Sequence, residues 1–79
     1  MNKIVTFYVD GWEILFVNGK EQFQWPSIDI HDIIKFCPIE SIHQEFAGGK
    51  LSQYVRECGI FPHTIKECAE LNPKLSKYL

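Results

Sequence analysis

The sequence predicts a single α+β domain, in which a three-stranded antiparallel meander packs against three or four short helices. Asp10-Gly11 and Asn18-Gly19 are strong hairpin signals, and each separates segments rich in β-forming residues. Beyond residue 26, apolar residues recur at helical spacing between proline and glycine breaks. Residues 1–26 form the predicted meander and residues 27–79 the predicted helical part of one domain, 1–79, because the chain is too short for two cores.

The meander is predicted from pairings across two-residue loops. These pairings are Val9 with Trp12, Phe7 with Ile14 and Val5 with Phe16, then Ile14 with Phe23 and Trp12 with Trp25. All of these side chains then share one face of the sheet. The opposite face carries Ile4, Tyr8, Leu15 and Val17, and is more apolar than a solvated face normally is.

The first strand, IVTFYV, has no charge within it and is predicted to lie at an edge of the sheet. Such an edge predicts either homodimerisation through the first strand or a partner protein laid across the second sheet face. The alternative is that the C-terminal segment of the chain covers this face.

The helical part begins after Pro26, where Ser27 or Asp29 can cap a helix that runs to about Phe36. A second helix is predicted for residues 39–46, and Gly48-Gly49 then breaks the chain. The tail, NPKLSKYL, is expected to form a turn and a last short helix.

Residues 51–70 predict two short helices that meet at a tight turn. Leu51, Tyr54, Val55 and Cys58 fall on one helical face, and Gly59 follows where a helix must end. Phe61, Ile65, Cys68 and Ala69 repeat the spacing, with Pro62 suited to a first helical turn.

This segment resembles the helix-turn-helix motif of bacterial and phage DNA-binding proteins, because GIFPHTIKE is similar to the G-[IV]-S-x-x-T-[IV] core of that family. The resemblance covers about 20 of the residues and implies that five side chains pack the two helices: Tyr54, Cys58, Ile60, Ile65 and Cys68. It also implies that the helix from Pro62 to Leu71 enters the major groove of double-stranded DNA.

The resemblance assigns a role to each polar residue of the pair. The residues nearest base edges are expected to be His63, Lys66 and Glu67. Those placed for phosphate contacts are expected to be Thr64, Lys50, Ser52 and Gln53. The function implied is that of a small DNA-binding transcription regulator of phage or mobile-element origin.

Charge is distributed unevenly along the chain. Residues 1–49 hold three lysines against seven carboxylates, whereas residues 50–79 hold five basic residues against three acidic ones. The positive end coincides with the helix pair, as a phosphate-binding face requires.

A second function belongs to a different class. Phe61 stands where the helix-turn-helix family usually has Ser or Thr, and an exposed Phe beside a Pro is typical of a protein-binding knob. The alternative is therefore a protein-binding module or inhibitor, for example an anti-defence protein. Its contact residues would be Tyr8, Leu15, Val17 and Phe61.

No set of residues predicts an enzyme, a cofactor or a metal site. Cys58, His63 and Cys68 lack a Cys-x-x-Cys pair, and Asp29, His31 and Asp32 have no matching nucleophile. Three widely spaced cysteines do not form a secreted disulfide framework. The N-terminal apolar run, cut by Asp10, is too short for a signal peptide or a membrane span. A cytoplasmic location is expected.

Overall fold

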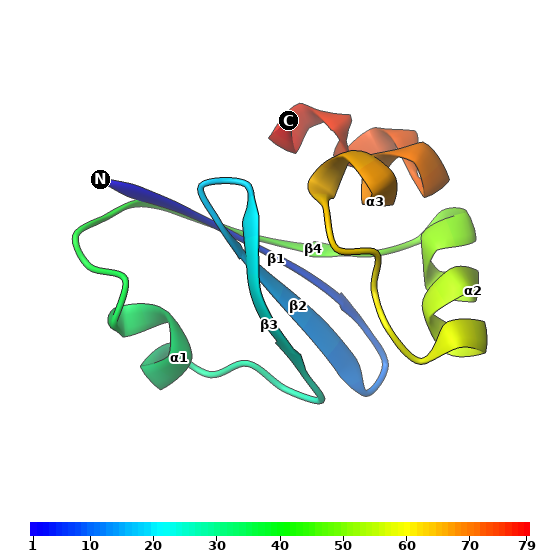
Figure 1. Cartoon of the computed structure of the whole chain (residues 1–79), viewed down its shortest axis with the longest axis horizontal. Coiled ribbons are helices and arrows are strands. Elements are labelled where there is room, and N and C mark those ends of the chain that lie inside the picture. Colours follow the sequence, from blue (N-terminus) through cyan, green and yellow to red (C-terminus); the bar gives the residue numbers. More distant parts are fainter.

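The computed structural model describes residues 1–79 as a four-stranded mixed sheet with short helices around it (Figure 1). The α+β class is confirmed. The strands are β1 (Asn2–Val9), β2 (Trp12–Val17), β3 (Lys20–Trp25) and β4 (Ile39–Phe46), in the spatial order β3-β2-β1-β4. The helices are α1 (Ile30–Ile34), α2 (Gly49–Cys58), α3 (Ile65–Leu71) and the 3₁₀ helix η1 (Pro73–Tyr78).

The two predicted hairpins are present, and the register of the first is confirmed. β1 and β2 pair Val9 with Trp12, Phe7 with Ile14 and Val5 with Phe16. In the second turn both Asn18 and Gly19 have positive φ, at 52° and 82°, as a two-residue hairpin loop of the I′ type requires.

The predicted register of the second hairpin is wrong by one residue. Phe23 lies opposite Leu15 and Trp25 opposite Glu13, because the pairing shifts between Leu15 and Phe16. An irregularity of this kind adds one residue to one strand, and every side chain beyond it then changes face. Phe23 and Trp25 therefore lie on the second face of the sheet.

The helix predicted for residues 39–46 is also wrong, because this segment is β4, a strand that runs parallel to β1. The segment forms a strand because the free backbone groups of β1 provide it with interstrand hydrogen bonds. A helix of eight residues is only marginally stable by itself, so the pairing with β1 outweighs the helical spacing of the side chains. β1 consequently has neighbours on both sides and is not an edge strand, so the dimer predicted through it is excluded. The edges of the sheet are β3 and β4.

The first face of the sheet, here called the major face, carries the main core. Its five side chains are buried beneath α2, α3 and η1: Val5, Phe7, Val9, Ile14 and Phe16. The helical segments contribute Leu51, Val55, Ile65, Cys68 and Leu75 to the same cluster, and the loop between α2 and α3 contributes Phe61.

The second face, here called the minor face, is only half covered. At one end Ile4, Leu15 and Val17 are buried against partly buried apolar side chains of α1 and its flanks, namely Ile28, Ile33, Phe36 and Ile39. Asp29 caps α1 and forms a capping box with Asp32, which confirms Asp29 as the cap. The helix has only five residues and ends at Ile34, short of the predicted Phe36. Figure 1 shows α1 at the end of the sheet away from α2.

The C-terminal helices differ from the prediction at the junction between them. Gly59 ends α2 in the left-handed conformation (φ 75°), and its N–H donates to the Val55 carbonyl at 2.7 Å, as predicted for this glycine. α3 begins at Ile65, not at Pro62, because the Thr64 side chain accepts the Glu67 N–H and is the cap. The loop 59–64 is therefore longer than the three- to four-residue turn of a helix-turn-helix unit.

Candidate functional site

Three exposed aromatic side chains lie in one row across the uncovered end of the minor face. Trp25 of β3 is opposite Glu13, Glu13 is opposite Tyr8, and Tyr8 is opposite Phe46 of β4, so one row crosses all four strands. We call Trp25, Tyr8 and Phe46 the aromatic row. Their exposed fractions are 56%, 36% and 46%, and the Tyr8 and Phe46 rings meet edge to face with centroids 5.6 Å apart.

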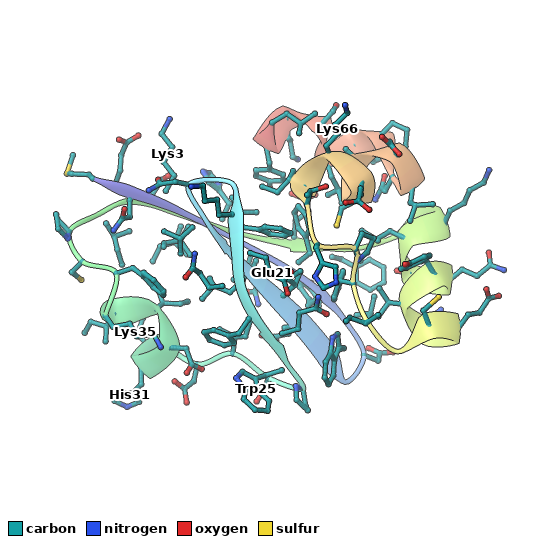
Figure 2. All side chains as sticks on the ribbon, viewed as in Figure 1. Lys3, Glu21, Trp25, His31, Lys35 and Lys66 are labelled. Atoms are coloured by element: carbon teal, nitrogen blue, oxygen red, sulfur yellow. The ribbon has the colours of Figure 1, made fainter.

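The aromatic row is open because the chain turns away from the sheet beside it. The Ile28 N–H donates to Glu13 Oε2 at 2.8 Å, which ties the segment that follows β3 to the middle of the row. From there α1 packs over the opposite end of the minor face and leaves the row uncovered. Figure 2 shows Trp25 at the end of β3, well apart from α3 and its Lys66.

Of the four residues predicted to contact a protein partner, the structure leaves only Tyr8 accessible. Leu15 and Phe61 are fully buried and Val17 is nearly so, and the prediction for these three is wrong. α1 covers Leu15 and Val17, whose strand face was expected to be open. Trp25 and Phe46 were missed, because one was assigned to the buried face and the other to a helix.

Phe61 is a core residue because the loop 59–64 lies along β3. Its ring is buried among the major-face side chains, while its N–H donates to Gln24 Oε1 at 2.8 Å and its carbonyl accepts from Gln24 Nε2 at 3.0 Å. A backbone bridge between Lys20 and Thr64 continues this contact. The loop therefore lies beside the outer edge of β3 and pairs with its backbone through one isolated bridge.

The predicted DNA-contacting residues of α2 are unequally placed. Lys50 and Gln53 are exposed, and the Gln53 amide donates to Glu57 Oε1 at 3.2 Å. Ser52 is buried, its hydroxyl has no hydrogen-bond partner, and it cannot reach a phosphate. Of the residues expected to pack the two helices, Ile65 and Cys68 are buried, whereas Cys58 and Ile60 are exposed.

Around α3, most of the predicted DNA-contacting side chains already bind one another or β3. The Thr64 hydroxyl donates to Glu67 Oε1 at 3.0 Å in addition to accepting the Glu67 N–H. His63 pairs with Glu21 of β3, and this hydrogen bond raises the pKa of the imidazole above its ordinary value. Lys66 is exposed and makes no ion pair within the chain.

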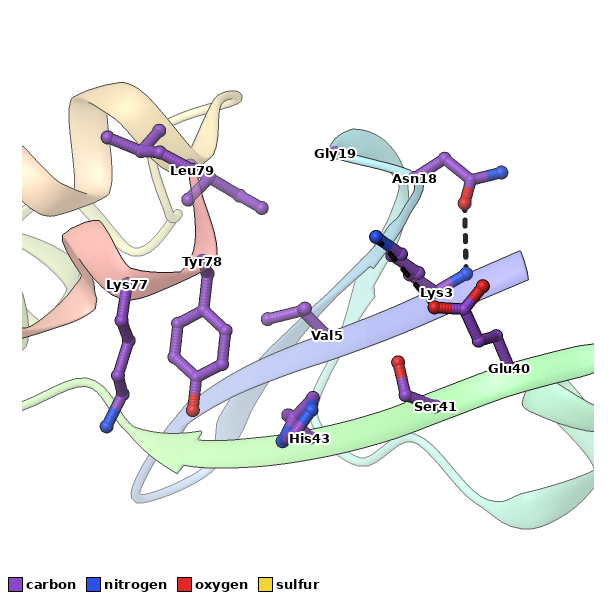
Figure 3. Close-up of a pocket in the computed structure, with 11 residues that line it drawn as sticks. Lys3, Val5, Asn18, Gly19, Glu40, Ser41, His43, Lys77, Tyr78 and Leu79 are labelled. Carbon is purple, nitrogen blue, oxygen red and sulfur yellow. Dashed lines mark hydrogen bonds and ion pairs between the residues drawn. The ribbon is translucent and has the colours of Figure 1, made fainter. Parts of the chain in front are cut away.

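A cleft of about 730 Å³ lies between η1 and the starts of β1 and β4 (Figure 3). Its two lysines are each neutralised by a carboxylate, Lys3 by Glu40 at 3.8 Å and Lys77 by Glu45 at 3.1 Å. The Tyr78 hydroxyl also donates to Glu45, and burial together with this bond raises the pKa of Tyr78 to about 12. These paired charges do not converge on a common point, as the groups of a catalytic or anion-binding site do.

The cysteines are all free, and their positions do not favour chemistry. Cys37 and Cys58 are exposed, while Cys68 is buried in the major-face core. Burial raises the pKa of the Cys68 thiol to about 12, so the thiolate that acts as a nucleophile or metal ligand is disfavoured. No group of three or more His, Cys, Asp or Glu side chains is arranged to hold a metal ion.

The fold and the aromatic row define a small α+β protein with a mixed sheet, one face of which is partly open. No family model matches the chain, and no curated protein or solved structure is detectably similar to it. None of its helices has the length and apolar character needed to cross a bilayer.

Proposed function

We propose that this protein is a non-enzymatic protein-binding module and that the aromatic row is its contact surface. The carrying observation is that Tyr8 and Phe46 are in contact and that Trp25 lies in the same register, separated from Tyr8 by Glu13, on a part of the sheet that no helix covers. Tyr, Trp and Phe are enriched in the centres of protein interfaces, where they supply much contact area and lose little side-chain entropy.

The aromatic row also carries polar groups that can form hydrogen bonds with a partner. Tyr8 presents a hydroxyl beside its ring and Trp25 an indole N–H, so each can bind through apolar area and one hydrogen bond. Rigid strands hold all three side chains, and the Tyr8–Phe46 contact fixes two of the rings against each other. A surface that is ordered before binding loses less entropy on association.

DNA binding by α2 and α3 stays a prediction, and it receives less support from the geometry. Of its seven contact residues, Lys50 and Lys66 are exposed cations free of ion pairs. The remaining residues are buried or hydrogen-bonded to Glu21, Glu57 or one another. Glu67 and Glu70 add negative charge to the helix that would approach the phosphates.

The proposal is tested by quantitative affinity capture from the organism that encodes the protein. Three baits are compared: the wild type, Trp25→Asp in the aromatic row, and Ile60→Asp as the matched control. Ile60 is an exposed apolar residue in the loop after α2, with 40% exposure. We expect a partner that the wild type and the Ile60→Asp bait retain and that the Trp25→Asp bait loses.

Two results would count against this function. A partner lost with Ile60→Asp and retained with Trp25→Asp would move the site to the helical side. Salt-sensitive binding of duplex DNA that Lys50→Glu and Lys66→Glu abolish would favour the regulator instead. An inhibitory role, an origin in a phage or mobile element, and a cytoplasmic location stay predictions.

A further inference from the structure

The loop 59–64 lies beside one edge of the sheet, β3, whereas no segment pairs with the outer side of the other edge, β4. The loop 59–64 lies beside β3, where one isolated bridge joins Lys20 to Thr64 and the Gln24 side chain binds the Phe61 backbone, whereas β4 packs alongside β1 only and leaves its other side open. β4 is eight residues long and contains no proline and no lysine, and its charged residues are Glu40 and Glu45. An edge of this length with no segment paired to its outer side is a template for another strand.

The register shows which backbone groups of β4 face outward. In a parallel pair, alternate residues turn both their N–H and C=O groups toward the neighbouring strand. The Ala47 N–H donates to the Tyr8 carbonyl at 2.8 Å, and Tyr8 is opposite Phe46, so His43 and Glu45 bond to β1. Ile42, Gln44 and Phe46 therefore turn their backbone groups outward, and no other segment of the chain pairs with them.

We propose that β4 pairs antiparallel with β4 of a second copy, about a twofold axis at Gln44, to form a continuous eight-stranded sheet. This register joins the outward-facing residues of both copies, with Gln44 against Gln44 and Ile42 against Phe46 twice. On the major side, His43 of each copy lies opposite Glu45 of the other. An interface of this kind is isologous, since each residue meets the same partner in both copies.

The side chains select this register over its neighbours. Moving the axis to His43 places the two His43 side chains opposite each other, and moving it to Glu45 opposes two carboxylates, which is unfavourable. The axis at Gln44 instead places His43 opposite Glu45, a carboxylate that already binds Lys77 and Tyr78 of its own chain, and buries exposed apolar area on the other side. Ile42 and Phe46 are 48% and 46% exposed in the single chain, so both gain from the contact.

The dimer would also extend the surface proposed for partner binding. Ile42 of the second copy would lie next to Phe46, so the aromatic row would continue into the minor face of its neighbour. The dimer itself does not rest on the proposed function, because it follows from β4 alone. Trp25 lies at the β3 edge, away from β4, so a substitution of Trp25 tests partner binding without affecting the dimer.

The first experiment measures association by sedimentation equilibrium up to about 1 mM chain. We expect a concentration-dependent dimer that dissociates at least about tenfold more readily after Gln44→Pro, which removes an outward N–H from each copy and no hydrogen bond to β1. Trp25→Asp should leave the dimer unchanged. A monomer at every concentration, or a dimer that Gln44→Pro does not weaken, would overturn the proposal.

A second variant tests the register even if Gln44→Pro fails to fold. Residues directly opposite in a hydrogen-bonded antiparallel pair have Cα atoms about 5.5 Å apart, within the range that a disulfide spans. In a background where the exposed cysteines are removed by Cys37→Ser and Cys58→Ser, Gln44→Cys should form a disulfide-linked dimer under mild oxidation. Gln22→Cys, at an exposed position of the β3 edge, is the matched control. Equal cross-linking of both variants, or of neither, would overturn the register.

Discussion

The two faces of the sheet carry similar apolar side chains but are covered to different extents. On the major face Phe7, Ile14 and Phe16 are completely buried under three helical segments. On the minor face a single five-residue helix covers Ile4 and Leu15, and the aromatic row beyond it is exposed. The major face therefore supplies stability, whereas the open end of the minor face is the part of the molecule that a partner can use.

The different roles of the two faces can be tested by truncating one aromatic residue of the major-face core and one of the aromatic row. Phe61→Ala removes a completely buried ring from the major-face core, and we expect it to lower the free energy of unfolding by about 3–5 kcal/mol. The adjacent Ile60→Ala should cost much less, because Ile60 is 40% exposed. Urea denaturation of the three proteins measures both values. Equal losses would mean that Phe61 is not part of the core.

The complementary change is Trp25→Ala in the aromatic row. We expect the free energy of unfolding to change by only about 0.5 kcal/mol, since Trp25 is 56% exposed, whereas partner binding should weaken by at least about 2 kcal/mol, or about 30-fold. Titration calorimetry with the captured partner gives the second value. A large loss of stability with unchanged affinity would reverse the roles assigned to the two faces.

Ser52 tests whether a buried hydroxyl without a hydrogen-bond partner destabilises the protein. Its hydroxyl is buried without a hydrogen-bond partner, so Ser52→Ala should raise the free energy of unfolding by about 1 kcal/mol. A regulator that uses Ser52 on phosphate would instead lose DNA affinity with this substitution. Thermal unfolding and a DNA titration of the same variant give both answers, and a destabilised Ser52→Ala would contradict the burial of this side chain.

The smallest expected effect is the pH dependence of the contact between His63 and Glu21 of β3. The hydrogen bond that the His63 ring N–H donates to the Glu21 carboxylate raises the pKa of His63 in the folded state above the unfolded value of 6.5. The stabilisation is then complete below pH 6.5 and is lost as the pH rises through the folded pKa. Wild type and His63→Gln should differ most in urea midpoint below pH 6.5 and converge above it. Both groups reach solvent, so the difference will be small; a difference that grew with pH would contradict the pairing.

Sequence patterns predicted those parts of the fold that local signals determine. Asn18-Gly19 specified a hairpin, Asp29 a helix cap and Gly59 a helix end, and each appears as predicted. Each depends on a backbone conformation that a few neighbouring residues control.

The errors arose where distant segments decide the outcome. The shift between Leu15 and Phe16 moves Trp25 to the other face, and no turn residue marks it. Residues 39–46 form a strand because they pair with β1. The spacing of their own apolar residues does not reveal this pairing. These two events create the aromatic row, so the candidate site could not have been assembled from the sequence, although Tyr8 was correctly placed on the second face.

Site-specific photo-cross-linking can show whether a partner protein lies against the aromatic row. A benzophenone amino acid in place of Tyr8, close to it in shape, is compared with the same probe in place of Ile60, in cells that encode the protein. We expect a cross-link to a different protein from position 8 and none to that protein from position 60. Cross-links to the same protein from position 60 alone would contradict the assignment of the aromatic row as the binding surface.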